Sequence, residues 1–211
     1  MSMFAHYHRI ILDSIFPPTA HERLLRKVTT ERFRKHYEPR TLGCTIALAA
    51  YESRTVQAAV AACKFEKNLH AATLLASLFD QWLTLHSSVG KTILIPIPLS
   101  EIREKERGFN QVTRVIDHIT SSPRLILQKN WLIRPTDTPR QTSLGRNARL
   151  DNMKGVFLTT PYVTQTDWET VDRIIICDDV MTTGATLEAA RMELRKVVPK
   201  GVTIICLAWA H

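Results

Sequence analysis

Features that mark membrane, secreted and zinc-binding proteins are missing from this sequence. No uninterrupted apolar run reaches the roughly 20 residues that a membrane-spanning helix needs. The apolar segment at residues 10–12 is broken by Asp13 and lacks the cleavage pattern of a signal peptide. The chain has four cysteines, none of them in a C-x-x-C pair: Cys44, Cys63, Cys177 and Cys206. We therefore expect a cytoplasmic protein without membrane insertion, whose thiols are reduced and form no zinc site.

The composition is that of a soluble globular protein with excess positive charge. Of 211 residues, 45% are hydrophobic, which suffices for one good core with an appendage. The net charge of +8 favours polyanionic partners, either phosphorylated substrates or nucleic acid, while solubility alone would also account for it. Histidines are frequent in residues 1–36, but no i, i+4 pair on one helix points to a metal site, so we expect them at the surface.

A strand, a small-residue turn and a helix follow one another after residue 173. The apolar run 174–177 predicts a buried strand, and residues 187–198 predict a helix. Between them, Gly184 lets the backbone approach a ligand closely, and the flanking threonines add hydroxyl donors. In α/β proteins such a turn holds phosphate, because backbone N–H groups and a helix N-terminus converge on the anion.

The paired acids Asp178 and Asp179 make this pattern specific. Carboxylates beside a phosphate repel it unless they serve another group, such as ribose hydroxyls near a divalent cation. A response-regulator receiver domain also has paired aspartates after a strand, but it needs roughly 100 further residues, and far fewer follow Asp179. An ordinary strand–turn–helix with Asp179 as a cap is the remaining structural alternative.

Residues 174–186 resemble, position for position, the signature of type I phosphoribosyltransferases, which bind phosphoribosyl pyrophosphate. The resemblance implies that Asp178 and Asp179 hold the ribose hydroxyls and act in catalysis. It also implies that the turn wraps the 5′-phosphate through five residues: Thr182, Thr183, Gly184, Ala185 and Thr186. Mg²⁺ would be bound through the substrate.

A second anion site is predicted after the strand at residues 92–97. A charged loop follows it, with Arg103 and Arg107 placed to grip the pyrophosphate, before a helix at residues 111–119. A solvated charge run with internal i, i+4 pairs is an equally good interpretation. The sequence Arg107-Gly-Phe-Asn-Gln, with the Pro-Leu after the strand, is similar to the ComF competence-protein branch of this superfamily.

The polar, proline-containing segment 131–157 matches the hood loop of the same branch in order. Four of its residues are expected to close over the site: Arg134, Gln141, Arg146 and Arg149. Members of the branch commonly carry a zinc module after a Phe-Pro-Pro start, but here Ala20 and His21 stand where its first cysteine is expected. The absence bears on functions of that module and not on the nucleotide-binding core.

We therefore expect an α/β fold with a parallel sheet of about five strands flanked by helices, like that of type I phosphoribosyltransferases. Residues 1–44 would form a basic extension, helical over 10–16 and 21–37 and packed on the core, and residues 45–211 the phosphoribosyltransferase-like domain. Trp209, after the final strand, is a candidate platform for a base.

The resemblance implies a protein that binds phosphoribosyl pyrophosphate or a nucleotide, in DNA uptake or nucleotide metabolism. The alternatives are a non-catalytic factor that handles single-stranded DNA, with competence or recombination proteins as partners, and a sensor of the sugar pyrophosphate. Aromatic platforms for single strands are not evident in the sequence.

Overall fold

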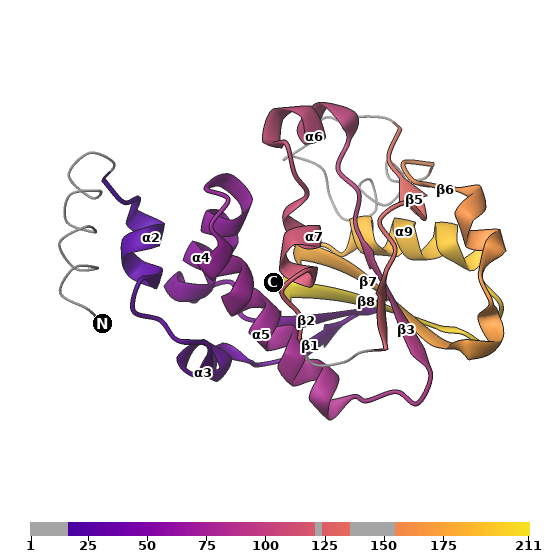
Figure 1. The fold of residues 1–211 in the computed structure, drawn as a ribbon, viewed down its shortest axis with the longest axis horizontal. Coiled ribbons are helices and arrows are strands. Elements are labelled where there is room, and N and C mark those ends of the chain that lie inside the picture. Colours follow the sequence, from indigo (N-terminus) through magenta and orange to yellow (C-terminus); the bar gives the residue numbers. More distant parts are fainter. Residues whose placement is uncertain (1–16, 121–123, 136–154) are drawn as a thin grey trace.

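The computed structural model describes residues 17–120, 124–135 and 155–211. Its centre is a six-stranded sheet in the order β1-β2-β8-β7-β3-β4 (Figure 1). The strands are β1 Arg40–Leu42, β2 Thr45–Ala49, β3 Lys91–Pro96, β4 Leu125–Leu127, β7 Val171–Val180 and β8 Thr203–Ala210. All neighbours run parallel except β1, which pairs with β2 antiparallel. The predicted α/β class and mostly parallel sheet are confirmed, and the two edge strands, β1 and β4, were not predicted.

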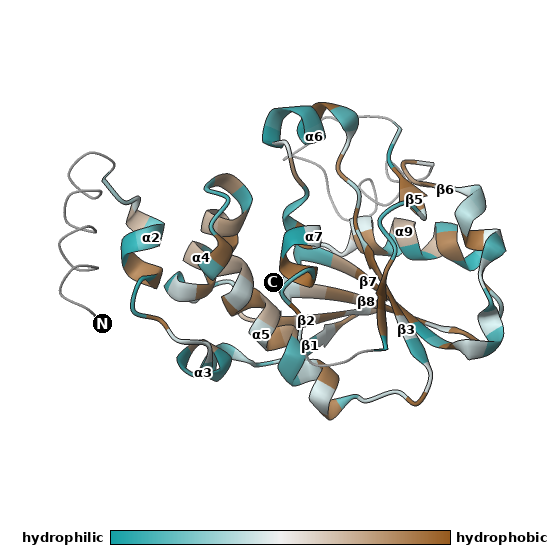
Figure 2. Cartoon of the chain, in the orientation of Figure 1, coloured by the Kyte–Doolittle hydropathy of each residue, from teal (hydrophilic) through white to brown (hydrophobic). Residues whose placement is uncertain are grey.

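Two hydrophobic cores cover the two faces of the sheet. Along β7, Ile175 and Cys177 face one core while Ile174 and Ile176 face the other, because side chains alternate across a strand. The first core is covered by α4 Arg54–Phe65, α5 Leu69–Leu85 and α7 Gln111–Ile116, and the second by α9 Ala185–Arg195. Figure 2 shows the hydrophobic residues concentrated in the central strands. Burial on both faces explains why these strands are continuous apolar runs.

The N-terminal part packs onto the first core. It contains α2 Ala20–Leu25, α3 Thr30–Phe33 and the 3-10 turn η1 Arg34–His36. The helices are separate because the Thr29 side chain caps α3. Leu25 and Phe33 are fully buried in the core, and α2 lies against α4. The division at residue 44 stays a prediction, and the expected helix at 10–16 lies outside the described residues.

The segment after β3 differs from its prediction as a loop. Residues Glu101–Arg107 form the helix α6, whose first turn is acidic and whose last turn is basic, as the helix dipole favours. Gly108 ends it in the left-handed conformation, with φ of +71°. The following helix, α7, begins at Gln111 as predicted but ends at Ile116 instead of residue 119.

A small antiparallel sheet lies beside the main one. Its strands are β5 Leu132–Ile133 and β6 Leu158–Thr159, followed by the 3-10 turns η2 Pro161–Gln165 and η3 Trp168–Thr170. The two strands flank residues 136–154, where most of the predicted hood loop falls and which lie outside the described part of the chain. None of the described helices is both long and apolar enough to cross a membrane.

Candidate functional site

The acid pair lies at the carboxyl end of β7, at the edge where parallel α/β sheets bind ligands. Both residues are largely shielded from water yet keep some exposed surface. The Asp178 Oδ1 atom accepts from the Asp179 amide at 2.8 Å, and the Asp179 Oδ1 atom accepts from the Val180 amide at 2.8 Å. These bonds fix the carboxylates, each of which keeps a second oxygen for other partners.

The charge of Asp179 affects the protonation of its neighbour Asp178. Burial raises the pKa of Asp178 above its ordinary value, and the neighbouring negative charge of Asp179 raises it further. The positive charge of Lys64 acts in the opposite direction. Asp178 therefore takes up a proton more readily than a carboxyl in water, unless a cation or hydroxyl donors stabilise its ionised form.

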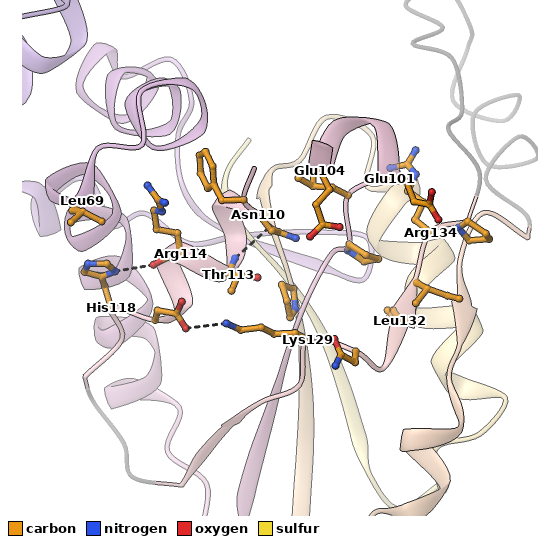
Figure 3. A pocket seen from close by; sticks show the side chains of 18 residues that line it. Leu69, Glu101, Glu104, Asn110, Thr113, Arg114, His118, Lys129, Leu132 and Arg134 are labelled. Carbon is orange, nitrogen blue, oxygen red and sulfur yellow. Dashed lines mark hydrogen bonds and ion pairs between the residues drawn. The ribbon is translucent and has the colours of Figure 1, made fainter. Parts of the chain in front are cut away.

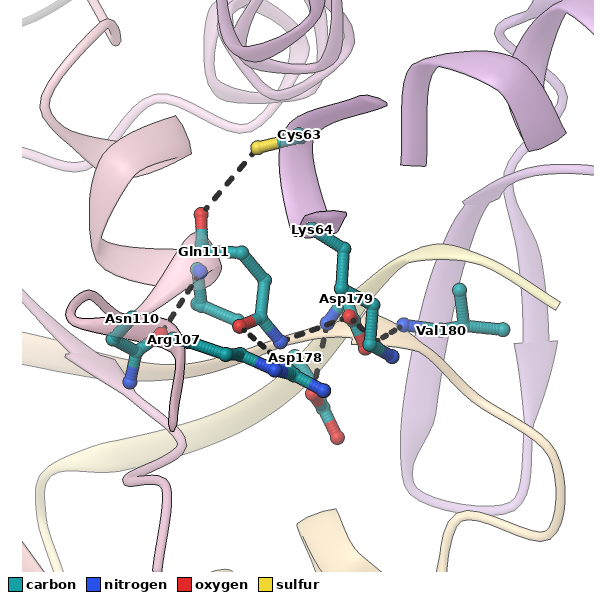
Figure 4. Close-up of polar contacts among 9 residues, drawn as sticks. Cys63, Lys64, Arg107, Asn110, Gln111, Asp178, Asp179 and Val180 are labelled. Atoms are coloured by element: carbon teal, nitrogen blue, oxygen red, sulfur yellow. Dashed lines mark hydrogen bonds and ion pairs between the residues drawn. The ribbon is translucent and has the colours of Figure 1, made fainter. Parts of the chain in front are cut away.

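A chain of polar contacts holds Asp179 from distant segments (Figure 4). The Asp179 Oδ2 atom accepts from Gln111 Nε2 at 2.9 Å and pairs with Lys64 Nζ at 3.1 Å. The amide oxygen of Gln111 accepts from Arg107 Nη1 at 2.9 Å. Because a guanidinium only donates and a carboxylate only accepts, the amide of Gln111 has one possible orientation. The chain thus links the end of α4, the end of α6 and the start of α7 to the acid pair.

The turn after β7 has the form of a phosphate cradle. Gly184 has φ of +76°, which favours glycine, and it directly precedes the eleven-residue helix α9. The Met181 amide donates to the Ala210 carbonyl at 2.8 Å and anchors the start of the turn. Among the described residues, no group accepts a hydrogen bond from the amides of four turn residues: Thr182, Thr183, Gly184 and Thr186. The Ala185 amide makes one long bond to Thr183 Oγ1 at 3.4 Å. These N–H groups can therefore serve an anion.

The arginines predicted for pyrophosphate and hood contacts have different positions. Arg107 joins the network around Asp179, whereas Arg103 lies one helical turn earlier on α6. Arg134 follows β5, and its guanidinium carbon lies 5.7 Å from the centre of the Phe157 ring. The other predicted hood residues, Gln141, Arg146 and Arg149, lie outside the described residues.

Lys64 and Gln111 are site residues whose roles the sequence did not reveal. Lys64 follows an Ala-rich helical run, and Gln111 is only 5% exposed at the start of a helix, so neither position carries a local signal of ligand binding. Their roles become evident only from their contacts with Asp179 in the folded structure. Trp209 is not a base platform: it is fully buried in the first core, in edge contact with Phe79.

A cavity of about 710 Å³ lies next to this site, beyond the end of β3 (Figure 3). Pro96, which lines it, pairs in register with Cys177, the residue directly before the acid pair. Apolar residues of β3 and β5 and the charged side chains of Arg114 and Lys129 line it. The Lys129 ammonium pairs with the Asp117 carboxylate at 3.8 Å.

The described residues contain no cluster of three metal-binding side chains. Asp178 and Asp179 supply two carboxylates at the end of β7. They suit a magnesium ion that arrives bound to a phosphorylated substrate, since hard cations prefer oxygen ligands and keep much of their coordination on phosphates and water.

Comparisons with known proteins agree with the resemblance of the sequence. The chain is 36% identical to Competence protein ComFC of Bacillus subtilis over 109 residues, which are 49% of this chain and 39% of that protein. It is 28% identical to Competence protein F of Haemophilus influenzae over 117 residues, 56% of this chain and 50% of the other. These matches support a ComF-like family. The chain spans half the length, or less, of these curated relatives, and no model of a known family matches it.

Proposed function

We propose that this protein binds phosphoribosyl pyrophosphate together with Mg²⁺, as a phosphoribosyltransferase-like protein acting in competence. The observation that carries the proposal is the juxtaposition of two features at one sheet edge. Partly exposed Asp178 and Asp179 stand directly before a turn whose amides are open to an anion. A ribose 5-phosphate presents a phosphate at one end and hydroxyl donors beside it, so it matches both features.

In the reaction, a nitrogen nucleophile attacks the anomeric carbon, whose bond to the pyrophosphate oxygen breaks. The ring gains positive charge as the pyrophosphate leaves, and the carboxylates of Asp178 and Asp179 stabilise that charge. Arg107, held by Gln111, would donate charge-assisted hydrogen bonds to the leaving pyrophosphate. Mg²⁺ bound with the substrate would neutralise charge on the pyrophosphate, and the proton of the nucleophile passes to solvent.

Calorimetric titration with phosphoribosyl pyrophosphate and Mg²⁺ tests this proposal. The wild type should bind, and the double variant Asp178→Asn plus Asp179→Asn, which keeps the shape of both side chains, should lose binding by more than tenfold. Equal binding by both proteins would show that the acids do not hold the sugar. Release of pyrophosphate with a panel of bases then separates a transferase from a sensor that binds without turnover.

Single-stranded DNA is a second candidate ligand, because the structure contains an aromatic surface that the sequence did not reveal. Phe65 is 67% exposed, and Lys64 and Arg107 lie 5.9 and 5.7 Å from its ring centre. Phe109, at the entry to α7, is partly exposed and has the Arg114 guanidinium 4.1 Å from its ring centre. Aromatic rings among cations stack bases and attract the backbone of single strands. The names of the relatives suggest a role in competence, with which this surface agrees.

Fluorescence anisotropy with a labelled oligothymidine tests the second candidate. Phe65→Ala should weaken binding about fivefold to a hundredfold, the range measured for loss of one base–aromatic stack. Tyr162→Ala is the matched control, because Tyr162 is similarly exposed, at 59%, on the distant turn η2. Equal losses in both variants, or binding that ignores salt concentration, would exclude the aromatic surface as a strand-binding site.

A further inference from the structure

We infer that Lys64 is an exchangeable counter-ion, which neutralises Asp179 in the empty site and moves to the pyrophosphate when the sugar hydroxyls engage that carboxylate. This role rests on the proposed function and adds to it a response to the second anionic group of the ligand. A sugar phosphate without the pyrophosphate would break the ion pair between Lys64 and Asp179 and would give Lys64 no new anionic partner.

The need for an exchange follows from the contacts of Asp179. Its Oδ1 atom accepts from the Val180 amide, and its Oδ2 atom already contacts both Lys64 at 3.1 Å and Gln111 at 2.9 Å. The side chain is 14% exposed, so little of the carboxylate surface is open. A ribose hydroxyl therefore reaches the Oδ2 atom most readily when one of these two donors gives way.

Lys64 is the partner that can leave. Gln111 is buried and its amide is fixed at both ends, by Asp179 and by Arg107, so its departure would leave buried polar groups without partners. Lys64 stands in the last turn of α4, and its side chain is 25% exposed on a flexible stem. Its ammonium group can swing toward solvent or a ligand and stay hydrated.

The contacts of Phe65 indicate where Lys64 goes. Lys64 and Arg107 both lie within 6 Å of the centre of that ring, and both belong to the network at Asp179, Lys64 directly and Arg107 through Gln111. Two cations in one network attract an anion to their side of the site. A pyrophosphate offers such an anion, whereas the single phosphate of ribose 5-phosphate is expected in the turn at Gly184. Lys64 therefore distinguishes the two ligands.

Calorimetry of Lys64→Met with two ligands, each with Mg²⁺, tests the exchange. The variant should bind phosphoribosyl pyrophosphate about 10- to 100-fold more weakly, as expected for loss of a charge-assisted hydrogen bond. It should bind ribose 5-phosphate about twofold to fivefold more tightly, because Asp179 no longer has to give up an ion pair. Lys67→Met, three residues along on the same exposed segment, is the matched control and should change neither affinity more than about twofold.

The two directions of change separate this role from a structural one. If Lys64 only stabilises Asp179, the variant weakens both ligands together, and the inference is wrong. It is equally wrong if neither affinity changes. Lys64→Arg should restore the preference for the pyrophosphate. A wild type that binds neither ligand overturns the proposed function itself, and the wild-type titration alone reveals that outcome.

Discussion

The two halves of the site are built in different ways. The phosphate turn is one continuous segment, in which Gly184, the threonines and the start of α9 follow each other along the chain. The network around Asp179 instead joins Lys64, Arg107 and Gln111 from three separate elements. The turn should therefore respond to substitution mainly through ligand binding, whereas damage to the network should also be felt as a loss of stability.

The largest expected effect on stability is that of Gln111→Leu. Removal of the amide takes one hydrogen bond from Asp179 and one from Arg107 in a nearly buried position, which costs about 1–3 kcal/mol of unfolding free energy. Chemical denaturation measures the cost. Gln165→Leu, on the separate turn η2, is the control. An unchanged denaturation midpoint would show that the network contributes nothing to the fold.

Gly184→Ala tests the turn. A residue with a Cβ atom at φ of +76° costs about 1–2 kcal/mol, while the nearest neighbours of that atom, at 3.5 and 3.7 Å, allow the methyl group itself. We expect this moderate loss of stability, and weaker binding of phosphoribosyl pyrophosphate by about tenfold or more as the turn relaxes. Gly201→Ala is the matched control, since nothing lies within 4 Å of its added atom and its φ is not positive.

The effect of Asp178→Asn on the free energy of unfolding should depend on pH. A carboxyl whose pKa is raised on folding binds its proton more tightly in the folded state, so its contribution to stability is present at low pH and lost as pH rises through the raised value. The variant should thus be more stable than the wild type in alkaline solution, by about 1.4 kcal/mol for each unit of the shift, and similar below about pH 4. Thermal denaturation across pH measures the difference. A constant difference between the two proteins would contradict the raised pKa.

The smallest expected effect is that of Thr183→Ala in the turn. Its hydroxyl accepts one long hydrogen bond from the Ala185 amide, so stability should change by less than about 1 kcal/mol. Phosphoribosyl pyrophosphate should bind a few-fold more weakly, because one donor to the phosphate is lost. If the free energy of unfolding falls by more than the free energy of binding, the turn, like the network, is chiefly a structural element.

The difference between a local turn and a network assembled from distant segments also explains which parts of the site could be predicted from the sequence. The run 174–177, the acids and Gly184 signal a strand and an anion-binding turn because the interactions that define them are local. Lys64 and Gln111 carry no such signal, since they become site residues only where α4 and α7 reach the end of β7. The charge of residues 101–107 predicted a loop, but the balance of acid at the start and base at the end favours a helix. The prediction for Trp209 was wrong because its side chain is buried in the core and cannot stack on a base.

The position of β8 has a consequence for how the protein is made. The strand is synthesised after β2, β3 and β7, yet it lies between β2 and β7 and pairs with both. Its Ala210 carbonyl also anchors Met181 at the start of the phosphate turn. Until β8 emerges from the ribosome, β2 and β7 each lack their shared neighbour in the sheet, and unpaired strand edges favour wrong association. Asp178, Asp179 and the turn are synthesised before β8, but the site they form is complete only once this central strand has paired.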